Sequence, residues 1–384
     1  QGLYHAGGWR VSVKRQVLGV VLTGIADVLE WAIPNPKIKL RYFVMKKLLF
    51  IILFALLLLP VDARKITVLQ WNIWQEGTMV KGGYEAIVEE IARLRPDFVT
   101  LSEVRNYHDT NFTARLCKSL RQKGVQYYSF KSYDTGLLSR YPIEDSLVVF
   151  PHNCDHGTIH KLTTTVEGRK VNVYTAHLDY LNDAYYNVRG YDGSTWKEVT
   201  PPSTVKELLT LNDQSWRDDA IRVFLNEARH DIAAGEVVII GGDFNEPSWQ
   251  DWTASTAQLY DHHGFVVPWT VTKLLTDSGF KDAYRELHPD VLRFPGFTYP
   301  SYNAAVPSEK ITWAPKADER DRIDFVFYKG KGLNAVSAKV FGPDSCVCRS
   351  KPVADLPGEP IIKPMGTWPT DHKGVIVEMN LKSR

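Results

Sequence analysis

The chain has 384 residues, of which 44% are hydrophobic and 23% charged, a composition typical of a globular protein with a substantial core. Its 46 basic and 44 acidic residues give a formal net charge of +2 at pH 7. That balance, without blocks of Lys or Arg, gives little support for binding to long nucleic acid, although it is compatible with a local basic groove.

A secretory signal peptide is predicted near the start of the sequence. Met45 opens the run MKKLLFIILFALLLLPVDARK, which has two lysines, an apolar stretch from Leu48 to Leu59 and the small residue Ala63 at a suitable cleavage point. The apolar stretch is shorter than the roughly 20 residues needed to cross a bilayer. We therefore interpret residues 45–63 as a cleaved signal rather than an anchor, and expect a secreted or periplasmic protein with no stable membrane span.

Residues 1–44 precede this complete signal and begin with Gln1. We interpret them as upstream sequence of doubtful status, with a small extra helix as the alternative. Residues 1–63 carry eight basic and three acidic residues, so residues 64–384 keep 38 basic and 41 acidic residues, a net charge of −3. We expect residues 64–384 to form one domain. Its cysteines could pair after export, but the sequence does not settle which.

Short strands and helices alternate along this predicted domain. Runs of β-forming residues predict strands at 65–74, 97–104, 135–143 and 146–150, and a hairpin at 161–180 that turns at Glu167 and Gly168. Apolar residues at helical spacing predict helices at 83–96, 111–124, 215–235 and near 268–278. Further strands are predicted at 237–245, 321–330, 335–342 and 370–381. Hairpins with interspersed helices favour an α/β sandwich of mixed sheets with helices outside.

Polar side chains stand where the predicted strands end. Each taken alone has an ordinary explanation, such as a turn residue, a solvent-facing acid or a packed histidine. Their recurrence at six strand ends indicates a shared site, because reactive groups are often placed at the ends of strands. The residues are Asn72, Glu103, His177, Asp243, Asn245, Asp324, Asp371 and His372.

Six segments carry a resemblance to a known family. They are, in chain order, QWNIW, LSEV, TAHLDY, GGDFNEPS, DRIDFVFY and PTDHKGV. Together they resemble the endonuclease/exonuclease/phosphatase superfamily, the DNase I-like fold, over nearly all of residues 65–380. The resemblance implies a four-layered α/β sandwich, in which two mixed β-sheets pack face to face with helices outside, and metal-dependent hydrolysis of a phosphate ester. Residues 64–384 would then be the catalytic domain.

The resemblance and the residue chemistry together suggest a metal site. The expected ligands are the carboxylate of Glu103, the amide oxygen of Asn72 and the carboxylate of Asp371. Oxygen donors of this kind suit Mg²⁺ or Mn²⁺. Asp243 is expected to orient or deprotonate the attacking water, with Asn245 holding it or donating to a phosphate oxygen.

Two histidines are expected to act as donors. By resemblance, Asp324 orients His372, and His177 is the second donor to the phosphate or the leaving group. The sequence leaves open which of them protonates the leaving oxygen. Tyr180 and Arg322 are expected to bind substrate. The segment 180–214 is rich in Tyr and Trp, and either stacks on a base, sugar or lipid headgroup or is a surface insertion packed by its own side chains.

These patterns predict a secreted, divalent-metal-dependent phosphoesterase that hydrolyses phosphodiester bonds by metal-assisted attack of water. The substrate stays open between nucleic acid, a phospholipid headgroup and a small phosphodiester. A nonspecific nuclease and a sphingomyelinase- or phospholipase C-like enzyme are the alternatives, and a non-catalytic binding module on the same fold is the alternative from another class. No obligate protein partner is inferred.

Overall fold

The computed structural model describes residues 44–45, 47–48, 63–151 and 156–383. The chain from residue 62 onward forms one compact unit, distinct from residues 1–61. The signal peptide and the upstream segment expected in residues 1–63 lie almost wholly outside the described residues, so both stay predictions. Where the structure describes the chain, it contains no helix long and apolar enough to span a membrane.

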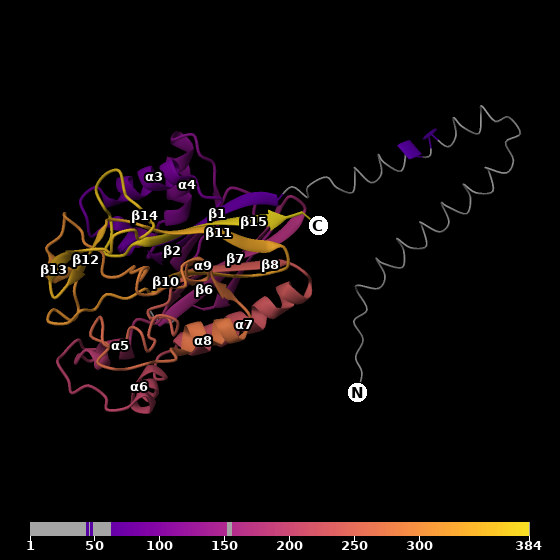
Figure 1. Ribbon diagram of the computed structural model, residues 1–384. Coiled ribbons are helices and arrows are strands. Elements are labelled where there is room, and N and C mark those ends of the chain that lie inside the picture. Colours follow the sequence, from indigo (N-terminus) through magenta and orange to yellow (C-terminus); the bar gives the residue numbers. More distant parts are fainter. Residues whose placement is uncertain (1–43, 46, 49–62, 152–155, 384) are drawn as a thin grey trace, which may run out of the picture. The chain divides into compact units, whose positions relative to one another are not determined.

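The first of two central sheets has seven strands (Figure 1). They are β1 (Ala63–Asn72), β2 (Phe98–Val104), β3 (Tyr128–Ser129), β4 (Asp134–Ser139), β11 (Leu333–Phe341), β14 (Ile361–Ile362) and β15 (Gly374–Lys382). Their order across the sheet is β14-β11-β15-β1-β2-β4-β3. Because β1 and β2 are parallel while β15 and β4 are antiparallel to their neighbours, the sheet is mixed.

The second sheet has six strands in the order β5-β6-β7-β8-β10-β9. They are β5 (Asp145–Phe150), β6 (Gly157–Val166), β7 (Arg169–Leu178), β8 (Val237–Asp243), β9 (Lys281–Asp282) and β10 (Asp324–Lys329). The predicted hairpin is confirmed as β6 and β7, which join through a turn at Glu167 and Gly168. A separate two-stranded ribbon pairs β12 (Ser345–Cys348) with β13 (Lys351–Ala354).

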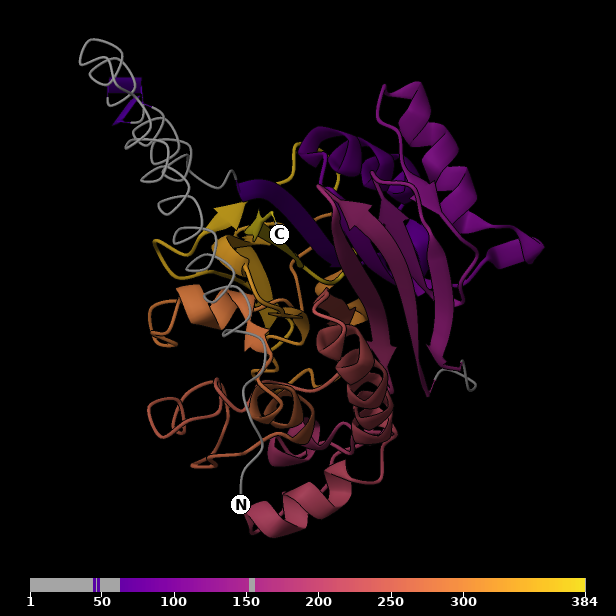
Figure 2. The same cartoon turned by 90° about the vertical axis from the view of Figure 1, so that its right-hand side faces the viewer.

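Helices cover the outer face of each sheet (Figures 1 and 2). On the seven-stranded sheet lie α3 (Gly83–Leu94) and α4 (Phe112–Gln122), and on the six-stranded sheet lie α7 (Arg217–Ala233) and α8 (Thr270–Asp277). The shorter helices are α5 (Ala184–Val188), α6 (Val205–Asn212) and α9 (Ala283–Leu287), and single 3₁₀ turns occur at η1 (Gln75–Gly77), η2 (Tyr107–Asp109) and η3 (Ser308–Lys310). The predicted four-layered α/β sandwich is confirmed.

Three apolar cores hold the layers together. β8 shows how one strand serves two of them, since Val237 and Ile239 face the core between the sheets while Val238 and Ile240 face the core beneath α7 and α8. A strand buried on both faces needs an unbroken apolar run, which is why this segment reads VVII. The third core lies under α3 and α4.

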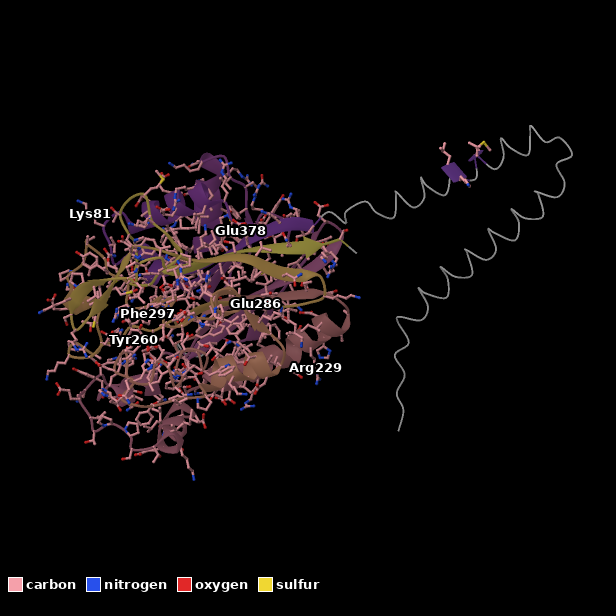
Figure 3. The ribbon with its side chains drawn as sticks, in the orientation of Figure 1. Lys81, Arg229, Tyr260, Glu286, Phe297 and Glu378 are labelled. Atoms are coloured by element: carbon pink, nitrogen blue, oxygen red, sulfur yellow. The ribbon has the colours of Figure 1, made fainter. Side chains whose placement is uncertain are left out.

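The long connections form a further cluster at one end of the fold, beside α5 and α6. Tyr185, Trp252 and Trp269 are buried together there. Tyr260 and Phe297, from two different connections, meet edge to face with ring centroids 4.8 Å apart, and both are labelled in Figure 3. Among the cysteines, Cys117, Cys346 and Cys348 are free thiols, and Cys154 lies outside the described residues.

Strand register brings the predicted polar residues to one edge. In the six-stranded sheet His177 lies opposite Asp243, which in turn lies opposite Asp324 at the start of antiparallel β10. In the seven-stranded sheet β15 runs antiparallel to β1, so the residues that precede β15 lie near the end of β1. Both sheets therefore present their polar ends to the same region.

Candidate active site

A pocket of about 300 Å³ opens where these strand ends meet. Its polar wall contains six of the predicted residues, namely Glu103, His177, Asp243, Asn245, Asp371 and His372. The predicted Tyr180 also lines it, together with the aromatic residues Trp74, Tyr185, Tyr186, Trp196, Tyr299 and Trp313. Segments more than 250 residues apart in the chain thus share one cavity.

Two histidines flank one carboxylate in the pocket. His177 Nδ1 donates to Asp134 Oδ2 (2.8 Å), and its Nε2 lies 3.9 Å from Asp243 Oδ2. His372 Nδ1 donates to Asp324 Oδ2 (2.9 Å), and its Nε2 lies 3.7 Å from the same Asp243 oxygen. Each imidazole is therefore oriented from behind by a buried acid and directs its other nitrogen toward Asp243.

Buried acids raise the pKa of both imidazoles, which favours their cationic form. Burial disfavours the charged form of His177, but the attraction and hydrogen bond of Asp134 outweigh it and raise the pKa to about 9. For His372 burial is likewise outweighed, by Asp324 and then Asp243, and the pKa rises to about 10. The pKa of Asp243 is raised by its burial and by the nearby Asp324, while both histidines oppose that rise. The two Nε2–H groups are thus available to donate to an anionic substrate.

Asn72 links the carboxylates of the two sheets. Its Nδ2 donates to Glu103 Oε1 (3.0 Å) and to Asp243 Oδ2 (2.9 Å). Its Oδ1 accepts from the backbone N–H of Trp74 (2.9 Å), and Glu103 Oε2 accepts from the backbone N–H of Gln75 (2.9 Å). In this orientation, assigned from the hydrogen-bond network, the amide holds two acids in place rather than offering its oxygen to a metal. The expectation that Asn72 is a metal ligand stays a prediction.

The remaining acids fit a divalent cation. Burial raises the pKa of Asp371 to about 7, opposed by His372 and reinforced by repulsion from Glu103, and both acids line the pocket. A cation between such carboxylates would relieve both the burial cost and the repulsion. Oxygen donors suit Mg²⁺ or Mn²⁺. Ligand atoms of Asp243, Asp324 and His372 also lie within 4.8 Å of one another, and there His372 Nδ1 is hydrogen-bonded to Asp324 Oδ2.

The comparisons with known proteins agree with this geometry. Residues 69–372 match the model of the Endonuclease/Exonuclease/phosphatase family. The chain belongs to this family. Its members are divalent-metal-dependent hydrolases that act on phosphoester bonds, so the protein is a hydrolase of that broad class.

One curated protein and two solved structures are among those to which the chain is similar. The uncharacterized protein F14F9.5 of Caenorhabditis elegans is 28% identical over 275 residues, which cover 69% of this chain and 79% of that protein. TDP2 of D. rerio, solved with a single-strand DNA product, is 16% identical over 82% of this chain and 99% of that one, with a TM-score of 0.46. An endonuclease/exonuclease/phosphatase from Beutenbergia cavernae is 17% identical over 83% and 72% of the two chains, with a TM-score of 0.45.

Backbone strain is concentrated around the pocket of this family member. Five lining residues other than glycine have a positive φ, a conformation that L residues adopt at an energetic cost. Glu103, at φ 67°, lies at an irregularity in the pairing of β2 with β4 that turns its carboxylate into the site. The others are Trp74 (φ 40°), Gln75 (φ 53°), Trp196 (φ 59°) and Asn245 (φ 47°).

Of the other predicted residues, Asn245 lines the pocket and Arg322 does not. Asn245 is fixed by its Nδ2, which donates to Leu178 O (2.9 Å), and by its backbone N–H, which donates to Asp243 Oδ1 (3.0 Å). Arg322, in contrast, is not brought to the pocket. It is buried and donates to Asp251 Oδ2 (2.9 Å) and Asp282 Oδ2 (2.6 Å), so its role here is structural and the predicted substrate contact is not supported.

The sequence interpretation missed Asp134 and Arg105. Asp134 is the first residue of β4, holds His177 and forms an ion pair with Arg105 (2.8 Å). An acid at the start of the predicted strand near residue 135, opposite the end of the strand carrying Glu103, was the signal that could have indicated it.

Proposed function

We propose that this protein is a phosphodiesterase, and that Mg²⁺ or Mn²⁺ bound by Glu103 and Asp371 assists attack of water on the phosphorus. The observation that carries the proposal is the convergence of two histidine Nε2 atoms on Asp243, 3.9 and 3.7 Å from one oxygen, in a pocket that Glu103 and Asp371 also line. A buried imidazolium pair is suited to an anionic ester, because its donors are fixed before the substrate arrives.

The residues of the chain then have separate tasks. Asp243 holds the attacking water and accepts its proton, and its raised pKa makes it a better base than a free aspartate. His177 and His372 donate from Nε2 to the phosphoryl oxygens and to the leaving oxygen. When bound, the divalent cation polarises the phosphoryl group and neutralises developing charge. Asn72 keeps Glu103 and Asp243 at fixed separation.

Hydrolysis of bis-p-nitrophenyl phosphate in the presence of Mg²⁺ tests the proposal. We expect turnover that a chelator abolishes and excess Mg²⁺ or Mn²⁺ restores. His372→Ala and Asp243→Ala are each expected to remove most turnover while the protein stays folded, as judged by circular dichroism. Near-full activity in either variant, or in the chelated protein, would show that the assignment is wrong. Absence of turnover by the wild type with Mg²⁺ would favour the non-catalytic binding module.

We also propose that the protein is exported, which the pattern of residues 45–63 supports. Expression of the whole chain followed by cell fractionation and N-terminal sequencing tests this. A mature N-terminus close to Ala63 in the periplasm or the medium is the expected result. Retention of an intact N-terminus inside the cell would refute it.

A further inference from the structure

We infer that the active-site pocket contains an aromatic subsite, formed by Trp313 and Trp196, that binds a flat ring carried by a small, singly charged phosphodiester. This inference rests on the proposed function and names its substrate class. Both indoles line the same pocket as His177, Asp243 and His372. Their ring centroids are 5.0 Å apart with the planes tilted by 33°, and the Trp313 side chain is 50% exposed.

The exposed indole is held by a rigid loop. The buried carboxylate of Glu319 accepts hydrogen bonds from the backbone N–H groups of Trp313 and Ala314 (3.1 Å each), and the Thr312 hydroxyl donates to the same side chain. A large apolar side chain on an anchored backbone loses little conformational entropy when a ligand covers it. Exposure alone does not indicate a binding role, but Trp313 lies beside a second indole on the wall of the catalytic pocket.

Trp196 is held against Trp313 at a cost in backbone strain. Its φ of 59° is unfavourable for a bulky residue, and glycine or asparagine would fit the backbone better. The turn is imposed by Asp192, whose side chain accepts from the backbone N–H of Thr195 (2.7 Å) and whose backbone O accepts from Trp196 N–H (2.9 Å). An indole kept where the backbone favours glycine indicates that the ring itself is used.

Two connections that are distant in the sequence are fixed to each other at this point. Lys316 forms an ion pair with Glu198, and its backbone N–H donates to the Tyr191 hydroxyl (3.3 Å). The ring centroids of Tyr186 and Trp196 lie 5.1 Å apart, so Tyr186 extends the aromatic surface toward the interior. The subsite is therefore assembled by tertiary contacts between residues 191–198 and 312–319, and does not belong to one flexible loop.

The size of the pocket fits a single phosphate group. Four acids line it, Glu103, Asp183, Asp243 and Asp371, against the three basic side chains of Arg105, His177 and His372. Arg105 is already paired with Asp134. A cavity of about 300 Å³ lies at the lower end of small-molecule sites, which span roughly 300–1,000 Å³. One phosphodiester with a flat substituent satisfies both the donors and the indoles of a cavity of this size.

The test compares esters that share a leaving group. Thymidine 5′-(p-nitrophenyl phosphate), bis-p-nitrophenyl phosphate and methyl p-nitrophenyl phosphate differ only in the second substituent, which is a nucleoside, a simple aryl ring or a methyl group. We expect wild-type kcat/KM to be about tenfold higher for a ring-bearing ester than for the methyl ester, consistent with one stacked ring. Preference for the thymidine ester over the bis-aryl ester would identify the ring as a nucleobase, and the reverse preference a simple aryl group.

Substitutions then show which side chain causes the preference for a ring. Trp313→Ala should reduce the ratio between ring-bearing and methyl esters to about threefold or less, through KM, and Trp313→Phe should keep most of it. Trp216→Ala is the matched control, because Trp216 is 45% exposed and lies outside the pocket lining. The inference would be overturned if Trp313→Ala changed kcat/KM equally for all three esters. It would also be overturned if Trp216→Ala reduced the ratio between the esters as much as Trp313→Ala does.

Equilibrium binding separates this inference from the proposed function. By calorimetry with the catalytically impaired His372→Ala protein, thymidine 5′-monophosphate should bind about tenfold more tightly than ribose 5-phosphate, and Trp313→Ala should remove the difference. Ring-dependent binding without any ester turnover would refute the phosphodiesterase proposal and keep the subsite. Turnover without ring preference, or equal binding of the two phosphates, would refute the subsite and keep the phosphodiesterase.

Discussion

Asp134 shows how a residue that does not line the pocket controls one that does. Its Oδ2 accepts from His177 Nδ1 at 2.8 Å and raises the pKa of that imidazole, against the cost of burial, to about 9. Since the folded pKa is raised above the value of about 6.5 in an unfolded chain, the stabilising pair is fully present below pH 6.5 and is lost as pH rises through 9. Hydrogen-bond donation by His177 Nε2 should be lost over the same pH range.

Asp134→Asn is therefore predicted to lower kcat and to move the alkaline limb of kcat/KM to lower pH. The neutral amide no longer stabilises the imidazolium, and a loss of up to about 100-fold is reasonable for a positioned acid–base group. The measurement is a pH–rate profile between pH 6 and 10. Asp97→Asn is the matched control, because Asp97 is also buried and accepts from Thr67 N–H (2.8 Å), but it precedes β2 and so lies at the other end of that strand from Glu103. An unchanged alkaline limb in Asp134→Asn would contradict the prediction.

A second prediction at the scale of single residues concerns Glu103 as a metal ligand. Its carboxylate faces the pocket and is fixed by the N–H of Gln75 and by Asn72, so Glu103→Gln keeps the shape of the side chain and removes one charge. The concentration of Mn²⁺ needed for half-maximal activity should rise at least about tenfold, because the site loses a charged oxygen ligand. Direct titration by Mn²⁺ electron paramagnetic resonance checks the affinity without relying on turnover. Equal Mn²⁺ affinity in the two proteins would exclude Glu103 as a ligand.

At the scale of elements, the first residue of α7 organises the rim of the pocket. Arg217 donates to Asp183 Oδ1 (2.5 Å) and to the backbone oxygens of Asp179, Leu181 and Asn182 (2.8–3.0 Å). Burial holds the pKa of Asp183 well above its usual value, and the Arg217 guanidinium opposes that rise. One side chain thus ties the segment after β7 to the start of a helix on the outer layer.

Arg217→Met is predicted to destabilise the fold by about 3–5 kcal/mol, because it leaves Asp183 buried without its cation and leaves several carbonyls unpaired. Urea unfolding followed by circular dichroism gives the free energy. Arg222→Met on the same helix is the control, since Arg222 is 57% exposed and pairs only with Asp218, and a surface pair of this kind contributes about 0–1 kcal/mol. Similar losses in the two variants would mean that the Arg217 network is not a stabilising unit.

Elements with a strong local pattern were predictable from the sequence, and elements defined by distant partners were not. The buried strand β8 and the hairpin β6–β7 follow from an apolar run and a Glu167-Gly168 turn. The helices α5 and α6 lie in a polar, aromatic segment whose packing depends on Trp252 and Trp269 from elsewhere. Arg322 was misassigned for the same reason, because its partners Asp251 and Asp282 lie 71 and 40 residues away and a charge beside a strand suggests exposure.

For the site, the motifs indicated the residues but not the way they are joined. The resemblance paired His372 with Asp324, and the structure places His372 Nδ1 2.9 Å from Asp324 Oδ2. The Asp134 partner of His177 has no comparable local signal, because only the antiparallel register of β4 with β2 brings it there. Asn72 was expected to offer its oxygen to a metal, and the structure adds that this oxygen accepts from Trp74 N–H while its amide nitrogen joins Glu103 and Asp243. Hydrogen-bond direction depends on neighbours that a linear sequence does not reveal.

At the scale of the whole molecule, the pocket links metal binding to the stability of the domain. Its walls come from both sheets, from β2 and the segment after β1 on one side and from β7, β8 and the residue before β10 on the other, so strain or repulsion in the pocket acts on the central sandwich. Without a cation, the folded state holds Asp371 with a pKa of about 7, raised from about 3.8 by burial and by Glu103. An acid whose pKa is higher in the folded state than in the unfolded chain lowers the stability of the fold as pH rises, here from about 4 to 7. The reason is that the unfolded chain releases its proton first.

The metal-free protein is therefore predicted to melt at a lower temperature at pH 7 than at pH 5. Millimolar Mg²⁺ should raise the melting temperature at pH 7 more than at pH 5, because binding to the folded state alone stabilises it by mass action and the cation competes with the proton at Asp371. Differential scanning calorimetry with and without chelator measures both effects. Asp371→Asn should flatten the pH dependence of the metal-free protein and reduce the response to Mg²⁺, whereas Asp97→Asn, which changes a buried acid at the other end of β2, should keep both. If the wild type and Asp371→Asn respond to Mg²⁺ alike, the cation does not bind between Glu103 and Asp371, and the acids of the pocket must be assigned another role.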